Sequence, residues 1–142
     1  MPLRNLEQIR AQHALEFNSL VVKGEAQATG QQGGEAIKKI PSMIMGNGLM
    51  ATLAFSAELK RGGEPKRPGY LAILTAVAKH LGSEEIEIVP AHIITAEALL
   101  NFLSESSSKT LQLATAESLS WLGYARRFVT PDDEHAGEAD SE

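Results

Sequence analysis

The chain has 142 residues, 43% of them hydrophobic, with a formal net charge of −5 and no cysteine. This length is typical of one domain with a sizeable core. The lack of thiols excludes disulfide frameworks, cysteine-ligated zinc and cysteine nucleophiles. The opening residues lack the apolar core of a signal peptide, and no apolar run approaches the roughly 18 residues that a membrane span needs. We therefore expect a cytoplasmic protein without membrane contact.

The negative charge is concentrated at the C-terminal end. Six of the 18 acidic residues fall within residues 131–142, which contain no lysine or arginine. The rest of the chain then has 13 basic and 12 acidic residues, so its charge does not exclude a nucleic-acid surface. We expect residues 1–130 to form one α-helical domain and residues 131–142 to be an acidic, disordered tail.

Apolar residues recur at three- and four-residue steps through most of the chain, which is the period of an amphipathic helix. The predicted helices cover residues 3–22, 37–59 with an interruption, 70–81, 96–104, and a last stretch from a cap at Ser108 or Thr110 to about 128. Thr95 is the expected cap of the fourth. Glycine-rich residues 24–34 and residues 60–69 are predicted loops. The fold class is therefore all-α, a single compact bundle of five to six helices.

The longest periodic run, residues 37–59, is interrupted by Gly46-Asn47-Gly48. A glycine inside a helix costs roughly 1 kcal/mol relative to alanine, so we expect a broken helix or two short helices meeting there. Asn47 is expected to cap the backbone exposed at the break. Pro41 either bends the helix or marks its start, because proline lacks a backbone N–H.

Candidates for chemistry are few. His13 lies in the apolar stripe of the first helix, where a packed histidine is a commoner explanation than a ligand. The four histidines fall on separate segments and form neither a two-histidine helical pair nor an HExxH motif. Residues 84–89, EEIEIV, fit either an extended connection or a short helical turn. We expect no catalytic residue, no metal site, no cofactor and no small-molecule substrate.

Three stretches of the chain together resemble one known family. They are the run from Ile40 through Asn47-Gly48-Leu49 to Phe55, the run TAESL followed by Trp121-Leu122 and Ala125-Arg126-Arg127-Phe128, and the opening LEQIRA. In order and spacing they are similar to the small all-α subunit of the type III-B CRISPR RNA-silencing complex, the Cmr complex. Residues 70–103 match that family only in helical character.

The resemblance implies a non-catalytic structural subunit of an antiviral ribonucleoprotein that carries a guide RNA (crRNA). Such subunits stack with copies of themselves beside backbone subunits and line the groove for target RNA. Paired basic residues suit a duplex held through its phosphates. We hypothesise contacts to the crRNA–target RNA duplex by Lys38, Lys39, Lys60, Arg61, Arg126 and Arg127. The alternatives are a helical protein–protein adaptor with no RNA role and, more weakly, a small helical enzyme or metal protein.

Overall fold

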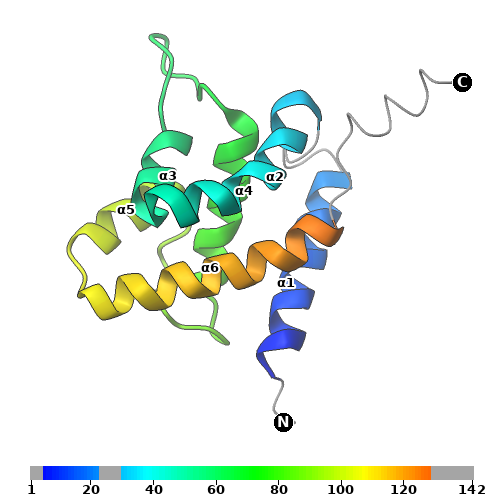
Figure 1. Cartoon of the computed structure of the whole chain (residues 1–142), viewed down its shortest axis with the longest axis vertical. Helices are drawn as coiled ribbons and strands as arrows, with labels where there is room; N and C mark the ends of the chain where they lie inside the picture. The colour runs from blue at the N-terminus through cyan, green and yellow to red at the C-terminus, as the bar shows by residue number, and fades with distance from the viewer. Residues whose placement is uncertain (1–4, 23–29, 129–142) are drawn as a thin grey trace, which may run out of the picture.

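Six helices make up the computed structural model, which describes residues 5–22 and 30–128 (Figure 1). They are α1 Leu6–Val22, α2 Gly30–Asn47, α3 Leu49–Ser56, α4 Pro68–Leu81, α5 Ala96–Ser104 and α6 Ser108–Phe128. The described residues contain helices and one isolated β-bridge but no β-strand, so the prediction of an all-α fold with five to six helices is confirmed. The predicted acidic tail lies outside the described residues.

Helix α4 lies at the centre of the bundle and contacts every other helix. Helix α1 packs mainly on α6 at one end of the molecule, and α3 packs mainly on α5 at the other (Figure 1). The side chains of Ile73, Leu74 and Val77 on α4 are fully buried, and each contributes about 1.5–3 kcal/mol by leaving water. None of the described helices is long and apolar enough to cross a membrane.

The predicted break in the central helix occurs at one residue, Gly48. Its φ of 96° and ψ of 158° lie in a region that glycine alone adopts readily. The backbone N–H of Gly48 donates to the carbonyl of Ile44 (2.8 Å) and ends α2, while the Thr52 hydroxyl donates to the Gly48 carbonyl (2.9 Å) in the first turn of α3. The expected cap by Asn47 is wrong, because no side-chain hydrogen bond caps the start of α3.

Pro41 lies inside α2 and does not mark its start. The helix continues through it because Ile40 and Ile44 on either side are buried in the core. We predict that Pro41→Ala raises the free energy of unfolding by about 1–3 kcal/mol, since alanine restores the helical N–H and removes the clash of the ring. Urea denaturation measures this change. An unchanged or lower value would contradict the prediction.

The helix ends otherwise follow the sequence pattern with small differences. The loop predicted over residues 24–34 is too long, because α2 already begins at Gly30. Thr95 caps α5 as predicted, with its hydroxyl accepting a backbone hydrogen bond. The predicted cap of α6 is displaced: Ser107 is the residue whose hydroxyl accepts from the backbone N–H of Thr110 (3.2 Å).

The connection after α4 folds back on the end of that helix. The backbone N–H of Glu87 donates to the carbonyl of Ser83 (2.8 Å), so residues 84–86 form the helical turn that was one of the two predicted alternatives for residues 84–89. Residues 87–89 do not continue the turn. Gly82 allows the close return, because a Cβ there would lie 2.9 Å from the carbonyl oxygen of Pro90. The turn holds Glu85 beside α1, where it contacts a histidine.

Candidate functional site

The six predicted RNA-contacting side chains are exposed and come from three parts of the fold. They are Lys38 and Lys39 on α2, Lys60 and Arg61 between α3 and α4, and Arg126 and Arg127 in the last turn of α6. Figure 1 shows the α3–α4 segment projecting beyond the helices at the top of the view, whereas α6 ends at the right. The pair Lys60 and Arg61 lies on this projecting loop, residues 57–67, and is therefore apart from the other two pairs.

The projecting loop has a hairpin-like conformation. The backbone N–H of Lys60 donates to the carbonyl of Glu64 (2.7 Å), and the N–H of Lys66 donates to the carbonyl of Glu58 (3.0 Å). These two bonds join the two arms of the loop, one near its tip and one near its base. Lys60 and Arg61 lie on this ordered loop, and their side chains are exposed.

Arg67 secures the base of the projecting loop. Its Nη1 donates to the carbonyl of Phe55 (3.1 Å) and to the carboxylate of Glu58 (2.7 Å). Its guanidinium also lies 3.7 Å from the centre of the Phe55 ring, a cation–π contact. The hydrogen bond from Arg67 lowers the pKa of Glu58 from its ordinary value. The side chain of Arg67 therefore stabilises the base of the projecting loop.

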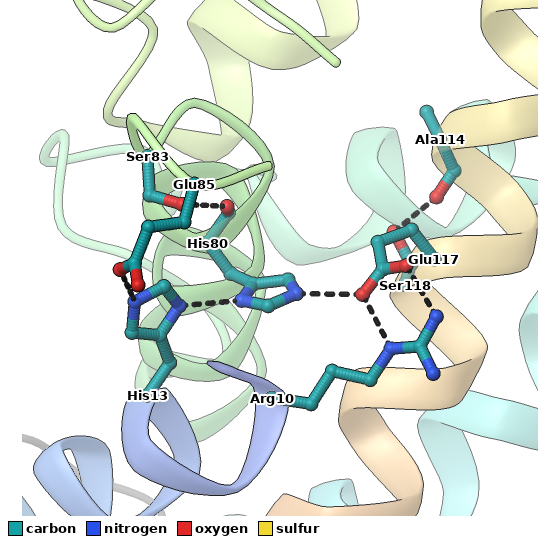
Figure 2. A network of polar contacts seen from close by, with 8 residues as sticks. All are labelled: Arg10, His13, His80, Ser83, Glu85, Ala114, Glu117 and Ser118. Atoms are coloured by element: carbon teal, nitrogen blue, oxygen red, sulfur yellow. Dashed lines mark hydrogen bonds and ion pairs between the residues drawn. The ribbon is translucent and has the colours of Figure 1, made fainter. Parts of the chain in front are cut away.

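A chain of polar side chains joins α1, α4 and α6 and forms the polar network of Figure 2. Glu117 on α6 is 6% exposed and accepts from both Nε and Nη2 of Arg10, each at 2.7 Å. Its Oε2 also lies 2.8 Å from Nε2 of His80. Nδ1 of His80 lies 2.8 Å from Nδ1 of His13, whose Nε2 lies 3.4 Å from Oε1 of Glu85. The network therefore links α1 to both of its neighbours and to the α4–α5 connection.

The carboxylate of Glu117 is the charged centre of the polar network. Burial raises its pKa, but the hydrogen bonds from Arg10 and His80 outweigh burial and lower the pKa to about 2. The same bond to Glu117 raises the pKa of Arg10. Both groups are therefore charged at neutral pH. A buried charge is tolerated when a partner of opposite charge and full hydrogen bonding accompany it.

We predict that the free energy of unfolding falls by about 3 kcal/mol as the pH drops from about 4.5 to about 2. The folded-state pKa of Glu117 is about 2, against an ordinary value of 4.5. Its stabilisation is thus fully present above 4.5 and is lost as the pH falls through the folded value. Denaturant titrations across this range test the prediction, with Glu117→Gln as the comparison. An equally steep acid decline in both proteins would contradict it.

A cavity of about 540 Å³ lies beside the polar network, between α1, α4 and the base of the projecting loop. Its walls are largely apolar and include Phe17, Leu71 and Trp121, while His13 and His80 provide polar atoms. The indole N–H of Trp121 is buried and has no hydrogen-bond partner among the described residues. The indole ring stacks on the imidazole of His80, with 5.8 Å between ring centres.

The side chains of the polar network can bind protons, and they attach α1 to the neighbouring helices. Both ring nitrogens of His80 lie within hydrogen-bonding distance of other network members. The hydroxyl of Ser83, beside the cavity, donates to the backbone carbonyl of His80 (2.9 Å). In the described part of the chain, no group of three histidine or carboxylate side chains is arranged to hold a metal ion.

The polar network was not predicted from the sequence. His13 lies in a partly buried stripe as expected, but its partner His80 is 67 residues away and lies on another helix. One local signal was present: Glu117 falls three residues after Ala114 and four before Trp121, on the buried face of α6. A buried carboxylate requires a cationic partner, so this position indicates a basic side chain on another helix.

Comparison with known families gives a match over most of the chain. The family model described as CRISPR-associated protein (Cas_Cmr5) matches residues 6–131. The match begins at the first residue of α1 and extends past the end of α6, so it includes the projecting loop and the polar network. No curated protein and no solved structure gives a match.

Proposed function

Because the chain belongs to the CRISPR-associated Cas_Cmr5 family, and is accordingly a subunit of a Cmr complex, we propose that it helps to line the target-RNA groove there. In this role it stacks with copies of itself and contacts the crRNA–target RNA duplex through backbone phosphates. It performs no catalysis. The observation that carries the proposal is the ordered loop between α3 and α4, which projects beyond the helices (Figure 1) and contains the exposed Lys60 and Arg61.

The projecting loop has the properties that phosphate contact requires. Neutralising backbone phosphates depends on exposed lysine or arginine and carries no sequence information. Such contacts suit a subunit that accepts any target paired with its guide, because an A-form duplex is recognised mainly by its shape and backbone. The anchor at Arg67 and the backbone bond from Lys60 to Glu64 reduce the conformational entropy that binding would otherwise cost.

The proposal of a structural role is supported by how the ionisable side chains near the cavity are used. The carboxylate of Glu117 accepts hydrogen bonds from Arg10 and His80, and a ring nitrogen of His80 contacts His13. These groups hold three helices together, which is the work of a scaffold. A general acid or base requires instead a group aimed at a substrate atom.

We predict that the double variant Lys60→Glu/Arg61→Glu weakens target-RNA binding by the reconstituted Cmr complex by at least about tenfold at low salt. The slope of log affinity against log salt should decrease in magnitude by about 2 for each copy of the subunit that contacts the duplex, because each copy loses two phosphate contacts. The control is Lys109→Glu, a single charge reversal at an exposed position in the first turn of α6. Unchanged affinity and slope in the double variant would refute the assignment.

The alternative is a protein–protein adaptor without an RNA role. Exposed apolar side chains favour it, since Met45 is 76% exposed and Leu113 is 51% exposed. The adaptor predicts that Cmr subunits are captured equally well after nuclease treatment. It also predicts that reversing the charges of Lys60 and Arg61 leaves RNA affinity unchanged. The charge-reversal experiment thus distinguishes the two functions.

A further inference from the structure

The cavity beside the polar network is a groove between two helices that run in opposite directions, α1 and α4 (Figure 1). The residues that line it follow the spacing i, i+3, i+4 and i+7 on each helix, from His13 to Leu20 on α1 and from Pro68 to Lys79 on α4. This spacing places them on one face of each helix. At 1.5 Å per residue, the lining face of α4 is about 17 Å long. We call this cavity the α1–α4 groove.

The two ends of the α1–α4 groove differ in polarity. His13 and His80 contact each other at one end, where Lys79 also lies. The other end, beside the base of the projecting loop, is formed by apolar residues that include Leu20 and Pro68. The groove is therefore apolar over much of its length and charged at one end.

The dimensions of the α1–α4 groove suit one face of a third helix. A helix with a diameter of about 10 Å and a length of about 17 Å occupies on the order of 1300 Å³. The groove has a volume of about 540 Å³, so only the side chains of one face can enter it. Such a helix must be apolar on the inserted face and polar on the face that stays in water. Trp121 of α6, only 1% exposed, forms part of the floor against which the apolar side chains pack.

This chain does not supply a helix of that kind. The exposed large apolar side chains of the described residues are Leu6, Leu15, Leu20, Met45, Leu59, Ile94 and Leu113. No two of them are three, four or seven residues apart, so no described helix exposes a stripe of large apolar side chains. Residues 23–29 and 129–142 contain one large apolar residue between them, Val129, and residues 1–4 amount to about one helical turn. The helix that fits must come from a chain of different sequence.

Lys79 indicates the charge of the occupant at the polar end of the α1–α4 groove. Its side chain is exposed and forms no hydrogen bond or ion pair with the described part of the chain. Glu16 also lines the groove, but its carboxylate already accepts a hydrogen bond from the side chain of Gln12 (3.1 Å). A carboxylate on the occupant is attracted by Lys79, whereas a lysine or arginine at that place is repelled.

We propose that the α1–α4 groove receives an amphipathic helix of another Cmr subunit, which inserts apolar side chains spaced three and four residues apart and places a carboxylate beside Lys79. Membership in a Cmr complex supplies chains of different sequence as partners. The docked helix also contacts Pro65 and Pro68 at the base of the projecting loop. This contact concerns the assembly of protein subunits and is separate from the proposed RNA contact.

Photocrosslinking from the α1–α4 groove of the assembled Cmr complex tests the proposal. A diazirine analogue of leucine replaces Leu71, which lines the groove, or Leu100 of α5, which does not. The two leucines are matched because both are half-buried. We expect position 71 to crosslink to another subunit, at a segment whose apolar residues recur every three to four positions. A crosslink from position 71 only to RNA or to a second copy of this chain would overturn the proposal, as would a yield no higher than from position 100.

Two substitutions test the same contact by affinity. Ala76→Phe places a ring in the α1–α4 groove and should weaken binding of this subunit to a complex assembled without it by at least about tenfold. Ala98→Phe, at a half-buried alanine of α5 outside the groove, is the matched control. Lys79→Glu should weaken binding most at low salt, whereas Lys109→Glu should not.

Full affinity of a folded Ala76→Phe chain would overturn the proposal, and circular dichroism establishes whether the chain is folded. If it is not, the crosslink from position 71 decides the matter, because the leucine analogue leaves the shape of the groove almost unchanged. Position 71 reports a protein partner and position 60 of the projecting loop reports RNA. The docking proposal and the RNA proposal can therefore fail separately.

Discussion

Replacing Glu117 with alanine should lower the free energy of unfolding by about 3–5 kcal/mol. The substitution removes the acceptor of two hydrogen bonds from Arg10 and of one from His80. Arg10 stays charged and partly buried, and His80 is 2% exposed, so water compensates poorly for the lost contacts. Chemical denaturation at neutral pH measures the change. We also expect α1 to lose more protection against hydrogen exchange than α4.

Two further variants separate the loss of the network from the loss of a carboxylate. Glu97→Ala removes an exposed carboxylate in the first turn of α5 and should cost less than about 1 kcal/mol. The double variant Arg10→Met/Glu117→Leu should be less destabilised than Glu117→Ala, because no buried charge remains without its partner. A double variant at least as unstable as Glu117→Ala would contradict this account of the network.

Gly48→Val should destabilise the fold by about 3 kcal/mol, whereas Gly46→Ala, two residues earlier, should stabilise it by about 0.5–1 kcal/mol. Gly48 has a φ of 96°, which a β-branched residue adopts only under strain. Gly46 lies in α2, and no neighbouring atom lies within 4 Å of a Cβ placed there. The two substitutions therefore test backbone conformation and not crowding.

Thermal and urea unfolding of the two glycine variants provide the measurement. Adding Gly48→Ala distinguishes backbone strain from side-chain size, because alanine adds only a Cβ and no atom lies within 4 Å of it. We expect Gly48→Ala to lower the free energy of unfolding by a large part of the amount that Gly48→Val lowers it. Stability equal to that of the unmodified chain would show that the α2–α3 junction tolerates another conformation. The break would then have no need of glycine.

The local architecture was largely accessible from the sequence. Helical periodicity, the Thr95 cap and the break beside Asn47 depend on residues close together in the chain, and the structure confirms each of them. The errors were also local. Asn47 does not cap α3, and Pro41 lies inside α2, because burial on both sides of the proline holds the helix together. Tertiary packing decided these points against the local signal.

The polar network was not accessible from spacing alone. Arg10 and Glu117 are separated by 107 residues, and only the packing of α1 on α6 brings them together. Both residues lie in stretches that resemble the Cmr subunit family, LEQIRA and TAESL. The two stretches therefore supply the residues of at least one helix–helix contact, the one between α1 and α6. RNA contact by the six basic residues stays a prediction; of these residues, Lys60 and Arg61 lie on the ordered projecting loop.

Site-specific photocrosslinking in the assembled Cmr complex tests the proposed RNA contact most directly. A photoreactive residue is placed at position 60 of the projecting loop or, as the control, at exposed position 109 on α6. Our account predicts that target RNA paired with the guide crosslinks to this subunit from position 60 and much less from position 109. A complex that cleaves or binds its target normally, yet gives no crosslink from the projecting loop, would contradict the proposal that this loop lines the RNA groove.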